Sequence, residues 1–254
     1  MISRHYVNTS EPSGREAVGS GEERSFRSLQ LSLKAILDFV AAVLLALVIW
    51  PLVLLVMLVV KLTSRGPVIY TQTRLGRNGR PFRIFKIRTM RHESEALTGP
   101  RWSSKTDPNI TVVGHFLRRS HLDELPQLWN ILRGEMSLVG PRPERPEFVT
   151  RLEIEIPRYR ERLAVRPGVT GLAQVQLPPD TDLESVRRKL VCDLAYIDQL
   201  GFGLDLRILF CTALGLVGIP YSASRKLFRV PTLVASDVVP TSEPAVLSLG
   251  AGAR

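Results

Sequence analysis

The longest hydrophobic run in the chain covers residues 35–60 and contains a single charged side chain, Asp38. As an α-helix these residues would extend about 39 Å, more than the roughly 30 Å of a bilayer's hydrocarbon core. The run starts too late and is too long for a cleavable signal peptide, and basic sequence follows it instead of a small-residue cleavage site. The pattern therefore predicts a membrane helix.

A proline, Pro51, lies inside this run, where it removes a backbone hydrogen-bond donor and bends a helix. Lysine and arginine flank the run on both sides, so the positive-inside rule gives no direction of insertion. Two interpretations remain open at this point. The helix crosses the bilayer with a tolerated proline, or two arms bent at Pro51 enter and leave by the same, cytoplasmic face.

After this helix the pattern becomes short and mixed. Two strand-like runs flank Asn78-Gly79, a pair that favours a tight hairpin turn. The apolar run at 206–219 is too short to cross a membrane, so we expect it against the core or in the membrane interface. Helical patterns occupy 122–132, 144–163 and 185–200. The predicted fold class is α+β and mostly helical, with interfacial amphipathic helices beside a small domain.

Composition along the chain divides it into parts. A polar segment precedes the membrane helix, and a segment rich in Ser, Pro and Val without a clear period ends the chain, so we expect irregular tails at both ends. Inside the domain, 91–109 reads as a mobile connector and 166–175 as a loop followed by a strand. The expected parts are 1–30 (tail), 31–62 (membrane helix), 63–220 (domain) and 221–254 (tail).

The basic charge is concentrated directly after the membrane helix. Residues 61–119 hold 13 of the 34 Lys and Arg but 3 of the 24 Asp and Glu, so their net charge of +10 equals that of the whole chain. Such a block suits anionic lipid or phosphorylated substrates, and it lacks any recognisable nucleic-acid-binding module. Two cysteines are too few for a disulfide framework, which favours a reducing compartment.

Two adjacent acidic residues, Asp123 and Glu124, stand just before Pro126, which fits the first turn of a helix. We therefore expect a helix that begins near the pair, whose carboxylates sit at its positive end and are favoured ionised. The apolar positions that define the expected buried face are Leu122, Leu125, Trp129 and Leu132. The expected polar stripe, pointing away from them, is Asp123, Gln127 and Asn130.

Taken alone, the acidic pair has two interpretations. It is an ordinary helix cap, or it is an ionised nucleophile or metal ligand that faces phosphates held by Lys86, Arg88 and Arg142. If 82–89 is a strand, Lys86 and Arg88 share one face, although protective charges on a solvated edge strand give the same pattern. Prolines on both sides of Arg142 restrict its backbone and would help aim its guanidinium.

Several segments together resemble the monotopic phosphoglycosyl transferases, bacterial enzymes that begin polysaccharide and glycoconjugate assembly on polyprenyl phosphate. The resemblance covers roughly 30–218 in the family's order. The matching segments are GPVIYTQTRLGRNGRPFRIFKIRTM, LDELPQLWNILRGEMSLVGPRP, RPGVTGLAQV, and DLAYI followed by LDLRILFCTALGLV.

The resemblance implies a re-entrant helix bent at Pro51 and a catalytic domain at the cytoplasmic face of the bacterial inner membrane. It implies that Asp123 attacks the β-phosphate of a UDP-sugar and expels UMP, and that polyprenyl phosphate then takes the phosphosugar. Glu124 would assist as an acid/base and positioning group, with Mg²⁺ at the phosphates and at Asp123. The family's phosphate-handling side chains correspond here to Lys86, Arg88, Arg118 and Arg142.

This chain departs from the family's pattern at two places. Trp50 precedes Pro51 where serine is common, and Gln176-Leu177-Pro178-Pro179 replaces an Asn-Gly-Arg tied to nucleotide recognition. Uridine recognition is therefore expected to use another residue. The alternatives to phosphosugar transfer are a glycosyltransferase that releases UDP and a catalytically silent anchor for a polysaccharide assembly complex. A homodimer stays open as an assembly.

Overall fold

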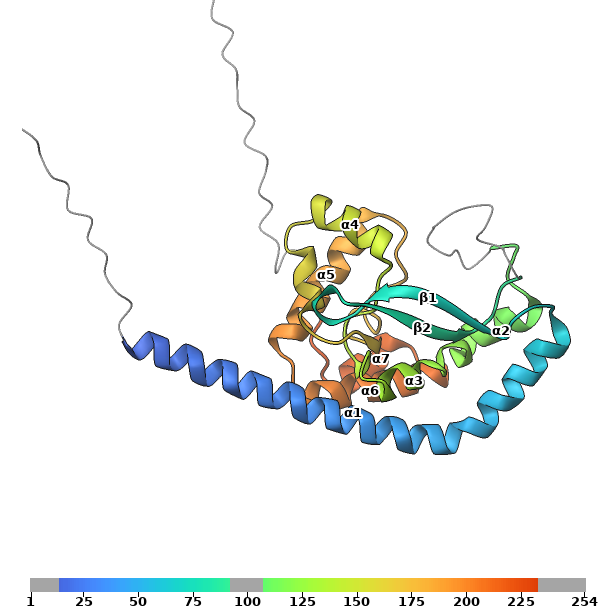
Figure 1. Cartoon of the computed structure of the whole chain (residues 1–254), viewed down its shortest axis with the longest axis horizontal. Helices are drawn as coiled ribbons and strands as arrows, with labels where there is room; N and C mark the ends of the chain where they lie inside the picture. The colour runs from blue at the N-terminus through green and yellow to red at the C-terminus, as the bar shows by residue number, and fades with distance from the viewer. Residues whose placement is uncertain (1–13, 92–106, 233–254) are drawn as a thin grey trace, which may run out of the picture.

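The computed structural model describes residues 14–91 and 107–232, and its longest element is the helix α1, Gly14–Thr63. The helix continues through Pro51, and Figure 1 shows it lying along one side of a small domain and curving upward in its C-terminal part. In the described part of the chain it is the one helix long and apolar enough to cross a membrane, over Ser25–Thr63. The predicted long apolar helix is therefore confirmed.

The two expected tails contain helix. α1 already begins at Gly14, inside the segment 1–30, and α7 (Tyr221–Leu227) lies inside 221–254. The expectation of an irregular chain fails for those stretches because α1 extends beyond its apolar part and because α7 packs against its neighbour α6, Phe202–Leu216. The rest of the two tails, and most of the connector 91–109, lie outside the described residues.

The predicted hairpin is confirmed. β1 (Ile69–Leu75) and β2 (Pro81–Ile87) pair antiparallel, with Tyr70 opposite Lys86. A 3-10 turn joins them, and Asn78 adopts φ 58°, a left-handed conformation that asparagine tolerates better than most residues. The alternation along β2 buries Phe82 and Ile84 on one face. Lys86 shares that face by the period of two, so it points inward toward the domain.

A second sheet has two short parallel strands, β3 (Ser137–Val139) and β4 (Gly168–Thr170). The expected loop followed by a strand in 166–175 is found in part: residues 166–167 precede β4, but the strand ends at Thr170 and 172–176 forms a turn. Glycine is required where the sheet meets the following loop. A Cβ on Gly168 would lie 2.1 Å from the backbone nitrogen of Gly140.

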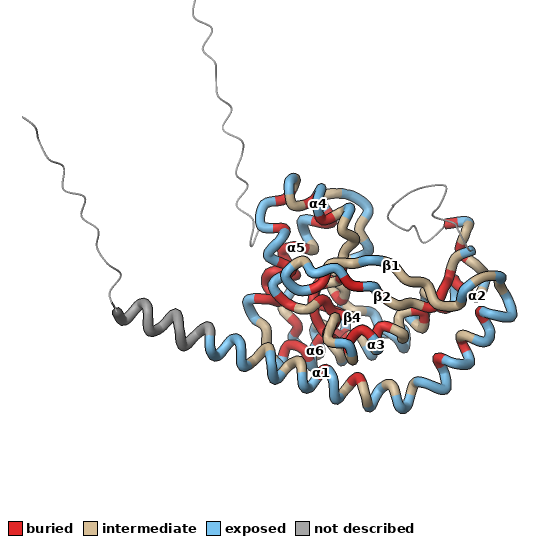
Figure 2. Tube along the Cα trace, viewed as in Figure 1, coloured by how far each residue is buried: buried red, intermediate tan, exposed pale blue. Residues whose placement is uncertain are grey.

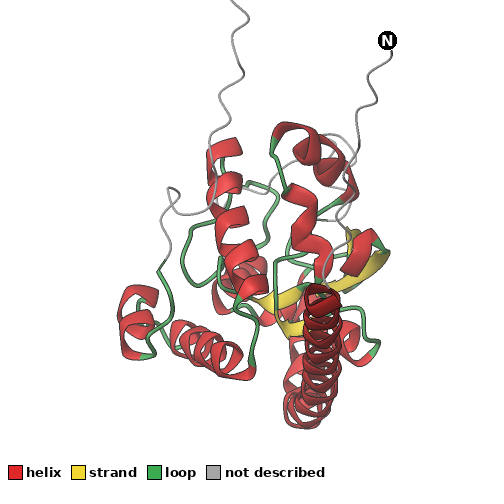
Figure 3. Cartoon of the chain, turned by 90° about the vertical axis from the view of Figure 1, so that its left-hand side faces the viewer, coloured by secondary structure: helices red, strands yellow, loops and turns green. Residues whose placement is uncertain are grey.

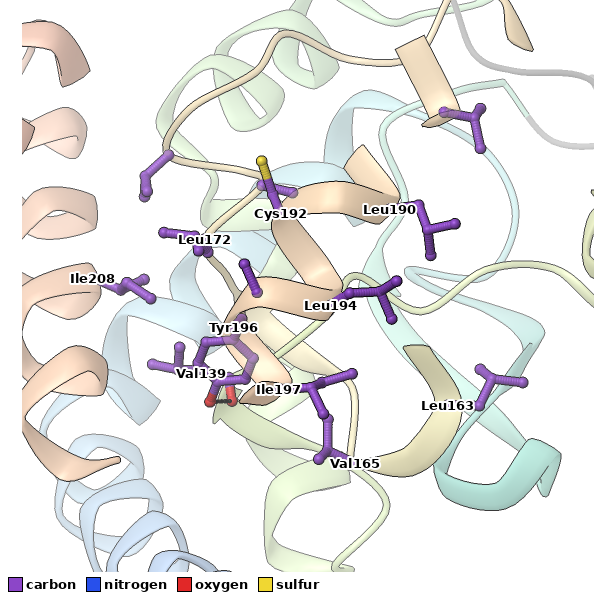
Figure 4. Close-up of a cluster of buried hydrophobic side chains, with 14 of the residues drawn as sticks. Val139, Leu163, Val165, Leu172, Leu190, Cys192, Leu194, Tyr196, Ile197 and Ile208 are labelled. Atoms are coloured by element: carbon purple, nitrogen blue, oxygen red, sulfur yellow. Dashed lines mark hydrogen bonds between the residues drawn. The ribbon is translucent and has the colours of Figure 1, made fainter. Parts of the chain in front are cut away.

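Helices make up most of the domain, as Figure 3 shows. α4 (Pro146–Glu155) and a 3-10 segment (Tyr159–Ala164) occupy the predicted charged helical region, and α5 (Leu183–Asp198) matches the predicted amphipathic helix. α5 begins with a capping box at Asp182 and Ser185. Leu190, Leu194 and Ile197 from α5 all belong to the main core, and Figure 4 shows Ile197 near Val165, with Leu172 and Ile208 on the other side of α5.

Both arms of α1 contact the domain, although its apolar surface is largely exposed (Figure 2). In the N-terminal arm, the Asp38 carboxylate accepts a bond from Ser137 Oγ (2.6 Å), and Lys34 Nζ lies 2.6 Å from Asp205 of α6. In the C-terminal arm, Val56 and Val60 pack with Ile87 and Leu117. The single charge of the apolar run therefore binds β3, and this contact explains why it is tolerated there.

Candidate active site

The acidic pair lies in a tight turn between two helices. α2 (Val112–Ser120) ends at His121, which has φ 55°, and a 3-10 turn, Leu122–Glu124, follows. The helix α3 begins only at Gln127, after Pro126. The prediction that a helix starts at the pair is therefore wrong by about one turn. The carboxylates are positioned by the α2–α3 connection and do not occupy the first turn of α3.

The predicted faces of this segment are wrong in two respects: the expected polar stripe is buried, and Trp129 of the expected buried face is exposed, although Leu122 and Leu132 do pack against core clusters. Trp129 is 56% exposed, whereas Gln127 and Asn130 are 1% and 0% exposed. Asn130 is buried because its amide joins α3 to β2: Oδ1 accepts from Phe85 N (3.2 Å) and Nδ2 donates to Arg83 O (2.7 Å). α3 lies between α1 and β2, and its Ile131 is buried in a core cluster with Ala42 of α1 and Ile84 of β2.

Glu124 is the charged centre of the site. Its Oε1 accepts bonds from Lys86 Nζ (2.7 Å) and from Arg142 Nη2 (2.8 Å). Burial alone would raise the pKa of this carboxyl, but Arg142 and Lys86 outweigh burial and hold the pKa well below its usual range. Burial lowers the pKa of Lys86, and Glu124 partly restores it. Three segments distant in sequence thus meet in one ion cluster.

Asp123 differs sharply from its neighbour. The residue is 8% exposed, and within the described residues no hydrogen bond or ion pair holds its carboxylate. Burial and the charge of Glu124 raise its pKa, against the influence of Lys86, His121 and Arg118. The expectation of a carboxylate made more acidic by a helix start is therefore wrong, because no α-helix begins here and burial is the largest influence.

The other two predicted cations lie differently. Arg88 follows the end of β2, and its Nη2 donates to Ser64 O (3.0 Å) and Ser64 Oγ (2.7 Å), so it joins β2 to the end of α1. Arg118 donates from Nε to Thr89 Oγ1 (2.9 Å), and its charge reaches Asp123. The structure thus brings Lys86 and Arg142 onto Glu124, whereas Arg88 bonds to Ser64, the residue that follows α1.

The Pro141-Arg142-Pro143 loop is fixed through all three of its carbonyl groups. Pro141 O accepts from the backbone nitrogen of Gly168 (2.9 Å), Arg142 O from Arg162 Nη2 (3.0 Å) and Pro143 O from Arg74 Nη1 (3.2 Å). The two prolines have no N–H, so the loop cannot continue a strand ladder. These bonds leave the Arg142 side chain, 36% exposed, directed at Glu124.

The chain that carries this site matches a known protein family. The profile of the family described as "Bacterial sugar transferase" matches residues 29–218, which include α1, the acidic turn and the Pro-Arg-Pro loop. The chain belongs to the bacterial sugar transferase family. The resemblance drawn from the sequence motifs is confirmed at the level of the family.

Curated relatives of the family are 40–45% identical to this chain in the following comparisons. One is "Undecaprenyl-phosphate glucose phosphotransferase" of Komagataeibacter xylinus (45% over 189 residues, 70% of this chain and 35% of that protein). Another is "UDP-N-acetylgalactosamine-undecaprenyl-phosphate N-acetylgalactosaminephosphotransferase" of Aeromonas hydrophila (42% over 176 residues, 69% and 41%). "Exopolysaccharide production protein PSS" of Rhizobium leguminosarum bv. phaseoli is 40% identical over 190 residues (72% and 94%). The chain thus spans well under half the length of the first two and nearly all of the third.

Sequence reasoning did not single out the residues that hold the loop. Arg74 and Arg162 act on backbone carbonyls, and nothing in their spacing marks such a contact. Half of the residues in the 3-10 segment around Arg162 are charged, so its sequence did not mark Arg162 as buried, and its partner Asp193 (2.7 Å) lies in α5. At the two departures from the family pattern, Trp50 is 57% exposed and Gln176 Nε2 donates to Pro231 O (2.7 Å).

Proposed function

We propose that this protein transfers a sugar-1-phosphate from a UDP-sugar to polyprenyl phosphate and thereby starts exopolysaccharide or glycoconjugate synthesis. One observation carries the proposal: within the described residues no hydrogen bond or ion pair holds the Asp123 carboxylate, while Lys86 and Arg142 both bond to the adjacent Glu124. A free carboxylate beside a fixed cluster of cations suits nucleophilic attack on a phosphate. Family membership and the names of the relatives support the same reaction.

The reaction takes place in two displacements. An Asp123 oxygen forms a bond to the β-phosphorus of the UDP-sugar, and the bond from that phosphorus to the bridging oxygen breaks, so UMP leaves with the electron pair. A phosphate oxygen of the lipid then attacks the same phosphorus and releases the Asp123 carboxylate. Because the intermediate is covalent, nucleotide and lipid need not be bound together.

The raised pKa of Asp123 suits a nucleophile in a partly dry site. A desolvated carboxylate is more reactive than a hydrated one, provided that nearby cations keep it ionised. Lys86 and Arg118 supply that positive charge, and both also face the phosphates in this proposal. Glu124 holds Lys86 and Arg142 in place, and its negative charge cancels one of their two positive charges.

A magnesium ion fits this site in a limited way. Mg²⁺ takes oxygen ligands and is commonly held by one or two carboxylates plus substrate phosphates. Among the described residues no group of three or more His, Cys, Asp or Glu could hold a metal, so the fit depends on Asp123, whose carboxylate accepts no hydrogen bond from those residues. Asp123 would be its protein ligand, and the bound ion would neutralise phosphate charge.

The membrane arrangement that we infer is re-entrant, with the bend at Pro51. The N-terminal arm binds the domain through Lys34 and Asp38, and the C-terminal arm packs on it through Val56 and Val60. A straight crossing would carry the two arms to opposite faces of the bilayer, yet both contact the same domain. This favours the same-side arrangement, at the cytoplasmic face where nucleotide sugars are made.

The test is product analysis with purified protein in nanodiscs, a UDP-sugar and undecaprenyl phosphate. The wild type should release UMP, and Asp123→Asn should release none while keeping its thermal stability. Release of UDP would indicate transfer of the sugar alone, and normal polymer production by an Asp123→Asn strain would indicate a silent anchor. Relatives are named for glucose and for N-acetylgalactosamine, so both UDP-sugars belong in the assay.

A further inference from the structure

The side chain that holds the centre of the Pro-Arg-Pro loop is fully committed to other protein groups. Arg162 is 5% exposed, and its Nε and Nη2 lie 2.9 and 2.7 Å from Asp193 Oδ2. Its Nη1 donates to Tyr159 OH (2.9 Å), over whose ring the guanidinium lies at 5.2 Å. Only Nη2 reaches the loop, at Arg142 O. Arg162 therefore has no face left for a substrate.

The backbone position of the Pro-Arg-Pro loop depends strongly on the bond from Arg162 to Arg142 O. Prolines 141 and 143 cannot donate backbone bonds, so the position of Arg142 is set by bonds to carbonyl groups. Arg162 is the donor to the residue whose own guanidinium reaches Glu124. Its removal leaves the Arg142 carbonyl without that donor and lets the backbone shift. The Arg142 guanidinium then loses its fixed distance to Glu124 Oε1.

We propose that Arg162 is a positioning residue for the transfer reaction and that it acts entirely through Arg142. The proposal rests on the proposed function, because it assigns Arg142 to phosphate handling. A displacement of about 1 Å at a reacting centre can cost on the order of 100-fold in rate. We therefore expect Arg162→Gln to lower kcat by about 10- to 100-fold.

A double-mutant cycle tests the coupling. UMP release is measured for Arg142→Gln, Arg162→Gln and the double variant. The double variant should be no slower than Arg142→Gln alone, because Arg162 then has nothing left to position. Losses that multiply would overturn the proposal. Arg162→Lys should recover part of kcat, since an ammonium can still bond to the Arg142 carbonyl.

A second measurement does not depend on catalysis. Hydrogen exchange of a peptide covering 140–145 should be faster in Arg162→Gln than in the wild type. The matched control is Arg158→Gln, at the residue just before the 3-10 segment, whose guanidinium bonds to the exposed Glu161 (2.8 and 2.9 Å). Unchanged exchange in Arg162→Gln would contradict the proposal. If the wild type releases no UMP, the proposed function fails, and the exchange result still decides whether Arg162 holds the loop.

A different feature, independent of the transfer reaction, lies where α1 meets the end of α3. A groove of about 330 Å³ opens there, with Ile36 and Phe39 of α1 on one side and Leu132 on the other. Arg133 and Arg166 line the same groove. Arg133 binds Glu135 (3.0 Å), but within the described residues no hydrogen bond or ion pair holds the Arg166 guanidinium.

The walls and the charge of this groove match one kind of occupant. Ile36 and Phe39 are 60% and 49% exposed and belong to the apolar surface of α1, so acyl chains would meet the groove directly. A guanidinium at a membrane surface binds phosphate through paired donors. α3 separates the groove from the acidic turn by about 9 Å of helix, so a phosphate held here would not reach Asp123.

The geometry points to a site for one anionic phospholipid of the surrounding bilayer, with its headgroup phosphate at Arg166. The test is the thermal unfolding midpoint of the full chain in neutral detergent. Added phosphatidylglycerol should raise the midpoint more than phosphatidylcholine does, and Arg166→Gln should lose this difference. Arg151→Gln, in α4, should keep it. An equal rise in Arg166→Gln, or the same rise with inorganic phosphate, would overturn the lipid site.

Discussion

Asn130 links α3 to β2, the strand that carries Lys86, so its replacement should loosen the contact between Lys86 and Glu124. Its side chain is completely buried and makes three bonds, to Phe85 N, Arg83 O and Glu135 Oε2. Asn130→Ala removes all three and leaves a backbone N–H and C=O of β2 without these partners. At about 1 kcal/mol for each lost bond plus the orphaned groups, the loss of stability should be roughly 3–5 kcal/mol.

For a domain of this size that loss corresponds to a fall of about 6–20 °C in the unfolding midpoint. Activity should also fall at temperatures below the midpoint, where the protein is still folded, because β2 carries Lys86 and the α2–α3 connection carries Glu124. Differential scanning fluorimetry in detergent and UMP release measure the two effects. Asn130→Asp keeps the acceptor for Phe85 N, but its second oxygen faces two acceptors, Arg83 O and Glu135 Oε2, so it should not restore the midpoint. A midpoint within one or two degrees of the wild type, with full activity, would refute the reasoning.

Three further predictions concern the fold, the nucleophile and the membrane helix. Gly168→Ala should prevent stable folding, because the added Cβ would lie 2.1 Å from the Gly140 backbone nitrogen. The yield of soluble protein after detergent extraction measures this effect. A yield equal to that of the wild type would contradict the prediction. Asp123 must be deprotonated to attack, and its pKa is raised by burial and by Glu124, so activity should be lost as the pH falls through that pKa. The pH profile of kcat/KM should therefore show an acid-limb pKa above that of an ordinary aspartate. Single cysteines at 28 and 63, probed with an impermeant thiol reagent, should both react from the cytoplasmic side. Labelling from opposite sides would exclude the re-entrant helix.

Some of this architecture could be predicted because local sequence determines it. The apolar run 35–60 had to be a helix, Asn78-Gly79 had to turn, and α5 has both a helical period and a capping signal. The strand period in β2 also predicted that Phe82, Ile84 and Lys86 share a face, although it left open whether this face points inward. These features depend on neighbours within a few residues and needed no knowledge of the tertiary fold.

The environment of the acidic pair could not be predicted in this way. Leucine spacing around Trp129 indicated one buried face. In the structure α3 packs between α1 and β2, so the polar side chains of Gln127 and Asn130 are buried as well. Burial of Asp123 and the two bonds on Glu124 come from segments far apart in sequence. The buried donors Arg74 and Arg162 are recognised only when the loop they hold is seen in three dimensions.

The central claim is that Asp123 becomes covalently joined to a sugar phosphate during turnover. The most direct measurement is peptide mass spectrometry of protein quenched after incubation with a UDP-sugar in the absence of lipid phosphate. The account predicts a peptide containing Asp123 that is heavier by one sugar phosphate, and that added undecaprenyl phosphate removes this mass. No adduct on that peptide, with UMP release at the normal rate, would contradict it.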